Sequence, residues 1–350
     1  LWEMWFLTGL PNRRVAVFVK IHHVMADGMA AVAVMGQLLD AVPDPTVEPP
    51  PSWTPKPPPT DRELLLDHRR ERLARRRHGL TVLQHPVPNV RRLWTSLPAV
   101  RDLYTAGSRE HTSLNRLVGE SRRIALVRTS LDELKRVAHD HNATVNDVLV
   151  SAVGGAVSTL FTHRGEPAPD TVPIYVPVTL RANRNDPGAT GNVISQIVVP
   201  VPTRAVNAVE RLVAVAAETR SRKGRNLPSL DLFTRSRLAR LALLRMIARR
   251  PVNVTTADLP GPRMPLYFAG APVLEMFALL PLIATESLGV GAISYAGQFT
   301  ITVVADRDAY PDLDGLVTAL QAELDHLTTE PDQARAPASR EVGAGHAVDR

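Results

Sequence analysis

The stretch RVAVFVKIHHVMADGMAAVAVMGQLLDAV, residues 14–42, carries the clearest fold signal of the chain. Residues 14–21 are apolar and rich in β-branched side chains, and their number suits a buried strand. The strand pattern ends at His22. After it, an Ala- and Leu-rich segment at 29–42 predicts a buried helix with Asp27 as its N-cap. We therefore expect a strand, a tight loop and a helix, which is a building unit of α/β proteins.

The same alternation of strands and helices continues from Arg123 onward. Ser130 is expected to cap a helix, with Glu133 at capping-box spacing, and Ala296-Gly297 to turn a hairpin. The further helices are expected at 144–159, 207–222, 232–250 and 311–327, and the strands at 124–128, 171–178, 193–201, 252–256, 272–279, 289–295 and 298–305. The fold class predicted from this pattern is α/β with mixed sheets.

With 350 residues, the chain is long enough for two domains. We place an N-terminal region at 1–122 and a C-terminal region at 123–328, and we expect a disordered polar tail at 329–350. Within the first region, nine of the twenty residues 41–60 are proline, which predicts a linker without regular structure. A basic helical segment follows at 61–78.

The composition excludes several classes of protein. The chain has no cysteine, which rules out disulfides, a thiolate nucleophile and Cys-ligated metals. Its 41 Lys and Arg against 35 Asp and Glu give a net charge of +6, which suits an anionic partner. The longest mostly apolar stretch, 271–284, is too short for a transmembrane span and is interrupted by two prolines and a glutamate. Any membrane contact is therefore expected to be peripheral.

The HHVMADG stretch, residues 22–28, is the most informative motif for chemistry. A histidine can take a proton from a hydroxyl nucleophile and give it to a leaving group. Asp27 could tether the loop, and Gly28 leaves space for backbone or substrate. The alternative is that two histidines merely end a strand and Asp27 merely caps a helix. A zinc site is disfavoured, because adjacent strand residues point to opposite faces and no third ligand is clustered nearby.

HHVMADG resembles the active-site motif of CoA-dependent acyltransferases of the chloramphenicol acetyltransferase type. The surrounding sequence is similar to one branch, the bacterial wax ester synthase/diacylglycerol acyltransferases. The matching stretches are Leu1-Trp2-Glu3 (the remainder of a PLWE motif), Asn146-Asp147 (an ND motif), VPVTLRAN at 176–183, Gly191-Asn192, LPGPRMPLYFAGAPV at 259–273 and ISYAGQFTITVVADRDAYPDLD at 293–314.

The resemblance implies two pseudo-symmetric mixed-sheet halves with the active site in a tunnel between them. Only 22 residues precede His23, so the first half is expected to be incomplete and the chain truncated at its start. It also implies that His23 is the general base, which takes the proton of an alcohol as that alcohol attacks an acyl-CoA thioester. The acceptor would be diacylglycerol or a long-chain alcohol, with acyl-CoA as co-substrate and no bound cofactor or metal.

The resemblance assigns roles to the other site residues as well. His22 would pack or polarise near the base, Asp27 would fix the loop, and Gly28 would line the substrate space. Asn146 and Asp147 would support the tunnel wall from the other half. Arg181 is a candidate counter-ion for Asp27, and the oxyanion donor is left open among Asn192, Ser294 and backbone amides.

The sequence departs from the family pattern at one position, and two other functions are compatible with it. ADLPGP at 257–262 has Asp258 where the family has the amide of a Ser-Asn pair. The rivals are a carrier-protein-dependent condensation or polyketide-associated acyltransferase, and a non-catalytic fragment that binds lipid surfaces.

The basic segments 61–78 and 232–250 fit either solvated helix faces or binding to an anionic membrane or lipid droplet. We expect a cytoplasmic protein associated with the inner face of the plasma membrane or with lipid inclusions. Nucleic acid is not an expected partner, and the oligomeric state is left open.

Overall fold

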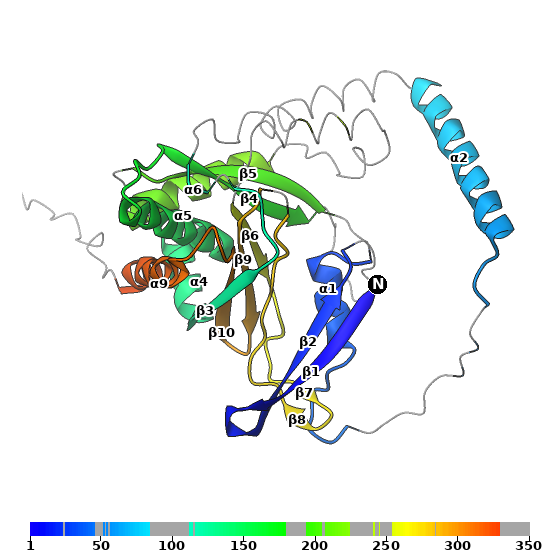
Figure 1. Cartoon of the computed structure of the whole chain (residues 1–350), viewed down its shortest axis with the longest axis horizontal. Helices are drawn as coiled ribbons and strands as arrows, with labels where there is room; N and C mark the ends of the chain where they lie inside the picture. Colours follow the sequence, from blue (N-terminus) through cyan, green and yellow to red (C-terminus); the bar gives the residue numbers. More distant parts are fainter. Residues whose placement is uncertain are drawn as a thin grey trace, which may run out of the picture.

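The computed structural model describes residues 1–23, 25–45, 52, 54, 57–84, 112–114, 116–179, 194–204, 207–224, 241, 245, 254–283 and 285–329. Its centre is a six-stranded sheet in the order β3-β10-β9-β6-β4-β5 (Figure 1). The strands are β3 (Arg122–Ser130), β4 (Thr171–Thr179), β5 (Ile194–Pro202), β6 (Val254–Leu259), β9 (Leu288–Tyr295) and β10 (Gln298–Asp306).

This sheet is mixed, as predicted. Strands β4, β6 and β9 run parallel to one another, whereas β5, β10 and β3 are antiparallel to their neighbours. β9 and β10 form the predicted hairpin, and both turn residues have positive φ, 46° at Ala296 and 86° at Gly297. Positive φ at both central residues matches the twist of a two-residue hairpin turn. The mixed α/β class is confirmed.

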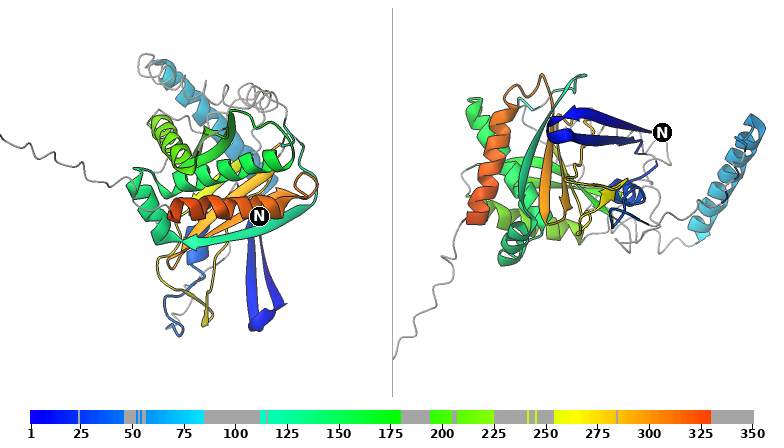
Figure 2. Two further views of the ribbon diagram at one scale, coloured as in Figure 1. Left: turned by 90° about the vertical axis from the view of Figure 1, so that its left-hand side faces the viewer. Right: turned by 90° about the horizontal axis from the view of Figure 1, so that it is seen from below.

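Four helices cover one face of the sheet: α4 (Leu131–Asp140), α5 (Val145–His163), α6 (Ala208–Lys223) and α9 (Leu313–Thr329) (Figure 2). Ser130 caps α4 as predicted, because its side chain accepts a hydrogen bond from the backbone N–H of Glu133. The apolar sides of these four helices and the strand residues that face them form the main core, which includes Leu149, Phe161, Ile174 and Phe299. The predicted helices at 144–159, 207–222 and 311–327 are thus confirmed within a few residues.

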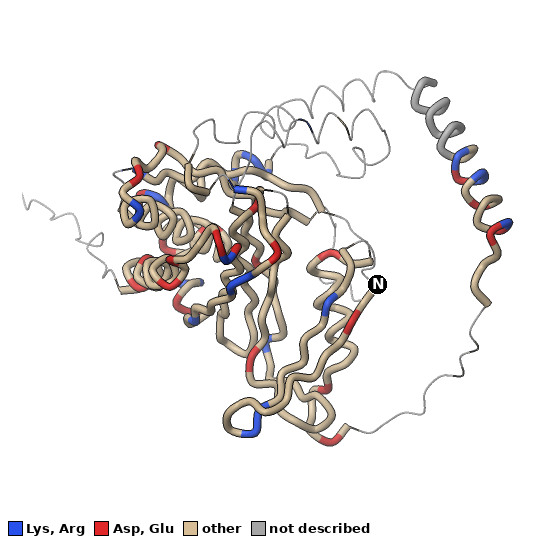
Figure 3. Tube along the Cα trace, in the orientation of Figure 1, with Lys and Arg blue, Asp and Glu red and all other residues tan. Residues whose placement is uncertain are grey.

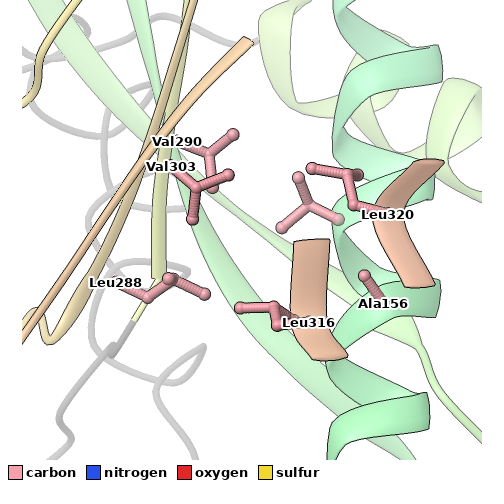
Figure 4. A pocket seen from close by; sticks show the side chains of 7 residues that line it. Ala156, Leu288, Val290, Val303, Leu316 and Leu320 are labelled. Atoms are coloured by element: carbon pink, nitrogen blue, oxygen red, sulfur yellow. The ribbon is translucent and has the colours of Figure 1, made fainter. Parts of the chain in front are cut away.

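A small apolar void lies inside this core, between α5, α9 and the sheet (Figure 4). Its lining is Val153, Ala156, Leu288, Val290, Val303, Leu316 and Leu320. With no polar group among them, these side chains make a packing defect of the core rather than a place for chemistry.

The N-terminal region adds a second, smaller sheet. β1 (Trp2–Leu10) and β2 (Arg14–Ile21) form an antiparallel ribbon joined by a short 3-10 turn, η1 (Pro11–Arg13). The strand at 14–21 was predicted, whereas β1 was not, although its aromatic residues favour strands. α1 (Gly28–Gly36) follows the histidine loop, and α2 (Asp61–Gln84) lies away from the sheets (Figure 1).

Two elements predicted from the sequence, one helix and one strand, differ from the structure. The helix predicted at 29–42 ends at Gly36, because the backbone of Asp40 pairs with Tyr267 through two hydrogen bonds of 2.8 Å. The strand predicted at 272–279 does not form, apart from the short pair β7 (Tyr267–Phe268) and β8 (Ala271–Pro272).

The residues after β8 instead cross the face of the large sheet. A Cβ on Gly291 would lie 2.1 Å from the carbonyl oxygen of Ala278, so glycine in β9 is what lets the crossing segment approach so closely. The apolar pattern of this segment therefore reflects contact with a sheet face and not membership of a sheet.

Several other expectations concern residues outside the described part of the chain. The basic helix at 232–250 and the tail beyond Thr329 fall there almost entirely. The described residues of the proline-rich stretch 41–60 form no helix or strand, and α2 begins at Asp61 and extends to Gln84, six residues past the predicted basic segment.

Candidate functional site

The histidine loop joins the end of β2 to the start of α1. Its strand end is fixed by the backbone, where the N–H of His22 donates to the carbonyl of Leu1 (2.8 Å) and the N–H of Met25 donates to the carbonyl of His22 (2.9 Å). At the other end, Asp27 is buried and caps α1, since its Oδ1 accepts from the N–H of Ala30 at 2.9 Å. The predicted N-cap is confirmed.

Both histidines of the motif, His22 and His23, are exposed residues. The resemblance implied an enclosed tunnel, and the described residues do not build one around His23. The reason lies in the sheets: β1 and β2 form a separate two-stranded ribbon, so no described strand closes over the histidine loop. The loop is thus anchored by the buried cap at its Asp27 end and exposed at its histidine end.

Gly28 connects this loop to the large sheet. A Cβ at Gly28 would lie 2.6 Å from Cδ2 of Leu259, the last residue of β6. The missing side chain therefore lets the first turn of α1 sit directly on the end of β6. In the middle of the ribbon, the rings of Phe6 and Phe268 lie 6.0 Å apart and connect β1 to β7.

Asn146 and Asp147 lie at the start of α5, on the helix-covered side of the sheet. Asp147 and Thr144 form a reciprocal capping box, in which the Asp147 Oδ2 accepts from the N–H of Thr144 at 2.9 Å. The Asp147 Oδ1 and the Asn146 Nδ2 are buried without a hydrogen-bond partner among the described residues. The position of the pair in the first helical turn was predicted correctly, and its contribution to a substrate wall stays a prediction.

Two predicted site residues, Arg181 and Asn192, lie outside the described residues, as does the proposed pairing of Arg181 with Asp27. Ser294, another candidate oxyanion donor, lies near the end of β9. Its Oγ accepts from the N–H of Gly261 at 3.1 Å and so supports the turn that follows β6. A Cβ on Gly261 would lie 2.0 Å from the carbonyl oxygen of Ser294, which explains the glycine in this turn.

Asp258 is the acidic group at the carboxyl end of β6. Burial raises its pKa to about 6, and the positive charge of Lys223, at the end of α6, acts in the opposite direction. The sequence marked this residue only as a departure from the family pattern. Its altered pKa requires the tertiary packing around β6.

A second polar cluster lies near the start of β6. Thr255 donates its hydroxyl to Glu286 at 2.9 Å, and burial raises the pKa of Glu286. Burial, and then the charge of Glu286, raise the pKa of Tyr175 to about 12. No pattern in the sequence pointed to this cluster, because its members come from three separate segments.

Two further kinds of site, a metal centre and a membrane span, are addressed by the described residues. They contain no group of three or more His, Cys, Asp or Glu side chains that could hold a metal ion. One helix, α5, is long and apolar enough by composition to cross a membrane, but 72% of the window that qualifies is buried inside the protein. It serves here as the core helix beneath the sheet.

The comparisons with known proteins identify the family. Residues 1–149 match the wax ester synthase/diacylglycerol acyltransferase catalytic domain, and residues 190–328 match the C-terminal domain of the same family. The chain belongs to this family. It is therefore a WS/DGAT acyltransferase, as the motifs in its sequence predicted.

Two relatives of this WS/DGAT protein come from Mycobacterium tuberculosis H37Rv. Both are described as putative diacylglycerol O-acyltransferases. One is 28% identical over 339 residues, covering 93% of this chain and 73% of the relative. The other is 30% identical over 332 residues, covering 89% and 68%.

Solved structures show the same fold. A wax ester synthase/diacylglycerol acyltransferase from Marinobacter aquaeolei VT8 superposes with a TM-score of 0.60 at 22% identity, covering 93% of this chain and 71% of that one. A condensation domain from the enacyloxin polyketide synthase gives a TM-score of 0.54 at 16% identity, covering 98% and 62%. At these identities the likeness concerns the fold alone.

Proposed function

We propose that this WS/DGAT protein transfers a long-chain acyl group from acyl-CoA to the hydroxyl of diacylglycerol or of a long-chain alcohol. The observation that carries the proposal is the match to both domains of the family over most of the chain, with the HHxxxDG motif intact in the first. Names of relatives point to diacylglycerol as acceptor, and the family name includes wax ester synthesis as well.

In this proposal His23 is the general base. It takes the proton of the acceptor hydroxyl as the oxygen attacks the thioester carbon, and it returns that proton to the CoA sulfur as the C–S bond breaks. The products are an ester and free CoA. No acyl-enzyme forms, so the lack of cysteine is no obstacle.

The geometry of the loop supports these roles. Asp27 is buried as the cap of α1, which suits a residue that shapes the loop and not one that meets the substrate. His23 is an exposed residue, which is compatible with access by a lipid hydroxyl. His22, whose backbone anchors the loop to Leu1, would support the base from the neighbouring position.

The test uses the chain with labelled palmitoyl-CoA and either diolein or hexadecanol. We expect ester formation that His23→Ala lowers by about 100-fold or more, a usual contribution of a general base. The control is His139→Ala, whose side chain is 91% exposed on α4. Transfer only from a carrier-bound thioester would support a condensation-type enzyme instead, and no turnover with either donor would contradict the proposal.

We also propose that the protein associates peripherally with an anionic lipid surface, on the cytoplasmic side of the membrane or on lipid inclusions, through α2. The sequence of this helix contains seven arginines and four acidic residues, and all four acids lie within residues 61–71. Figure 3 colours the charges of the first half of the helix, where both signs occur. Leu64, Leu65 and Leu66 are consecutive and exposed, so they spread around the helix and do not form one apolar stripe. Charge is therefore expected to contribute more to binding than insertion does.

Vesicle sedimentation tests this attachment. Vesicles containing about one third phosphatidylglycerol should bind the protein, and pure phosphatidylcholine vesicles or high salt should release it. Arg69→Gln/Arg72→Gln should weaken binding about tenfold or more, since each basic residue near such a surface contributes about 1 kcal/mol. Equal binding to both vesicle types would contradict a charge-based attachment.

A further inference from the structure

The polar cluster of Glu286, Thr255 and Tyr175 is not used by the proposed reaction. Glu286 stands between the crossing segment after β8 and the start of β9, and its Oε2 accepts from the Thr255 hydroxyl at 2.9 Å. Thr255 and Tyr175 are in register on the adjacent parallel strands β6 and β4. Neighbouring strands lie about 4.8 Å apart, so side chains on one face of such a pair lie side by side.

The cluster lies on the face of the large sheet that the four helices leave uncovered. Val254 on β6 and Ile174 and Val176 on β4 belong to the core under the helices, and side chains alternate along a strand. Thr255 and Tyr175 therefore both point to the opposite face. The N-terminal ribbon and α1 lie on that side of the sheet (Figure 2).

The same face of β6 leads from the cluster to the histidine loop. Leu259, on which Gly28 packs, is four residues beyond Thr255 and so lies about 13 Å along the strand on the same face. On the β9 side this row is bounded by the crossing segment. A Cβ on Gly289, which is in register with Thr255, would lie 3.1 Å from the Cβ of Leu280.

The cluster has hydrogen-bonding capacity that the described residues do not use. Among them, Thr255 is the only side-chain partner of Glu286, and no Lys or Arg forms an ion pair with this carboxyl group. The Tyr175 hydroxyl has no hydrogen-bond partner within the described part of the chain, and burial raises its pKa to about 12, so it stays protonated. An accepting oxygen and a donating hydroxyl on one face match the N–H and C=O of an amide.

The proposed substrates differ in where they carry such groups. A diacylglycerol or a long-chain alcohol has its only hydrogen-bond donor at the reacting hydroxyl itself. Acyl-CoA carries a second amide and a hydroxyl further along its pantetheine arm, beyond the amide next to the thioester. A cluster about 13 Å from the contact between β6 and the histidine loop therefore fits the acyl donor and not the acceptor.

We infer that Glu286 and Tyr175 bind the outer amide and the hydroxyl of the pantetheine arm of acyl-CoA, and that Thr255 holds Glu286 in place. The inference rests on the proposed function, because it names the part of the donor that this face of the sheet recognises. Burial raises the pKa of Glu286, which lessens the repulsion between its carboxyl group and the phosphates of CoA. An anchor for the crossing segment would need only the bond between Thr255 and Glu286, so the Tyr175 hydroxyl distinguishes the two roles.

The test compares two acyl donors with the full chain. Palmitoyl-CoA carries the whole arm, whereas S-palmitoyl-N-acetylcysteamine ends at the first amide. Tyr175→Phe should raise the KM for palmitoyl-CoA about fivefold and Glu286→Met about tenfold, which correspond to the loss of one hydrogen bond each. The KM values for the truncated donor and for diolein should change by less than about twofold. Glu286→Gln keeps an accepting oxygen and should recover most of the affinity.

Calorimetric titration with free CoA measures the same contact without turnover. Tyr175→Phe and Glu286→Met should weaken the binding of CoA by about the same factors as they raise the KM for palmitoyl-CoA. Tyr175→Phe should leave the Tm unchanged, because the bond between Thr255 and Glu286 is kept.

Three results would overturn the inference. The first is normal ester formation with an unchanged KM for palmitoyl-CoA in both variants. The second is an equal rise of the KM for both donors, which would mean a structural role at the crossing segment. The third is a rise of the KM for diolein alone, which would assign the cluster to the acceptor. Failure of the proposed function is recognised separately, because the unaltered chain would then form no ester from palmitoyl-CoA.

Discussion

The large sheet and the N-terminal ribbon of this protein are built from similar residues and are packed very differently. In β9 and β10 most side chains are buried, beneath four helices on one face and the crossing segment on the other. In β1 almost every residue is exposed, including Trp2, Trp5 and Phe6. The HHxxxDG motif lies at the end of this thinly packed ribbon. The proposed general base thus lies in the region with the smaller core, and Gly28 of its loop contacts Leu259 in the region with the larger one.

The largest expected effect is the loss of an aromatic ring from the sheet core. Phe299 is 1% exposed, and Phe299→Ala should lower the free energy of unfolding by about 3–5 kcal/mol. The matched substitution in the ribbon is Phe6→Ala at 55% exposure, which should cost about 1 kcal/mol through its contact with Phe268. Urea unfolding of both variants makes the comparison, and equal losses would mean that the ribbon is packed as tightly as the sheet.

The ion pair in the helix layer should contribute more to stability than the ion pair in the ribbon. Arg211 and Glu323 join α6 to α9 at 2.6 Å with 6% and 18% of their side chains exposed, so Arg211→Met should cost about 3 kcal/mol by removing the partner of a largely buried carboxylate. Lys20 and Glu3 in the ribbon are 3.8 Å apart and mostly exposed, so Lys20→Met should change stability by less than about 0.5 kcal/mol. Thermal denaturation at pH 7 would separate the two cases.

The stability of the region around the large sheet should also depend on pH. Arg164 donates to both carboxylate oxygens of Asp312, and these hydrogen bonds hold the pKa of Asp312 below its usual value. Stability from this group is therefore present above the usual carboxyl pKa and is lost as pH falls through the lowered one. Asp312→Asn should cost about 2 kcal/mol at pH 7 and progressively less toward pH 2, as followed by urea unfolding. A cost that does not change with pH would contradict this.

The smallest effect on stability is expected in the histidine loop. Asp27→Asn keeps an oxygen that can cap α1, so stability should change by only a few tenths of a kcal/mol, whereas Asp27→Ala should cost about 1 kcal/mol. Acyl transfer by Asp27→Asn then reports whether the loop needs the charge of this side chain or only its cap. If Asp27→Asn lost as much stability as Asp27→Ala, capping would not be the main contribution of the carboxylate.

Local patterns predicted much of this fold. β-branched runs located most strands, and Asp27 and Ser130 marked helix starts because caps are decided by neighbours within one turn. The strand predicted at 272–279 was wrong, because an apolar segment can pack across the face of a sheet as well as form a strand within it. The first strand was missed because a ribbon exposed on both faces lacks the alternation that marks a half-buried strand.

The sequence alone determined the family and the candidate base, since a short motif such as HHVMADG is read from adjacent residues. Only the tertiary structure decided that the Asp27 side chain is buried, that Gly28 sits on Leu259 and that burial raises the pKa of Asp258. Each of these facts depends on burial or on contact between segments far apart in the chain. Such contacts and the pKa values that they change arise when the layers pack together.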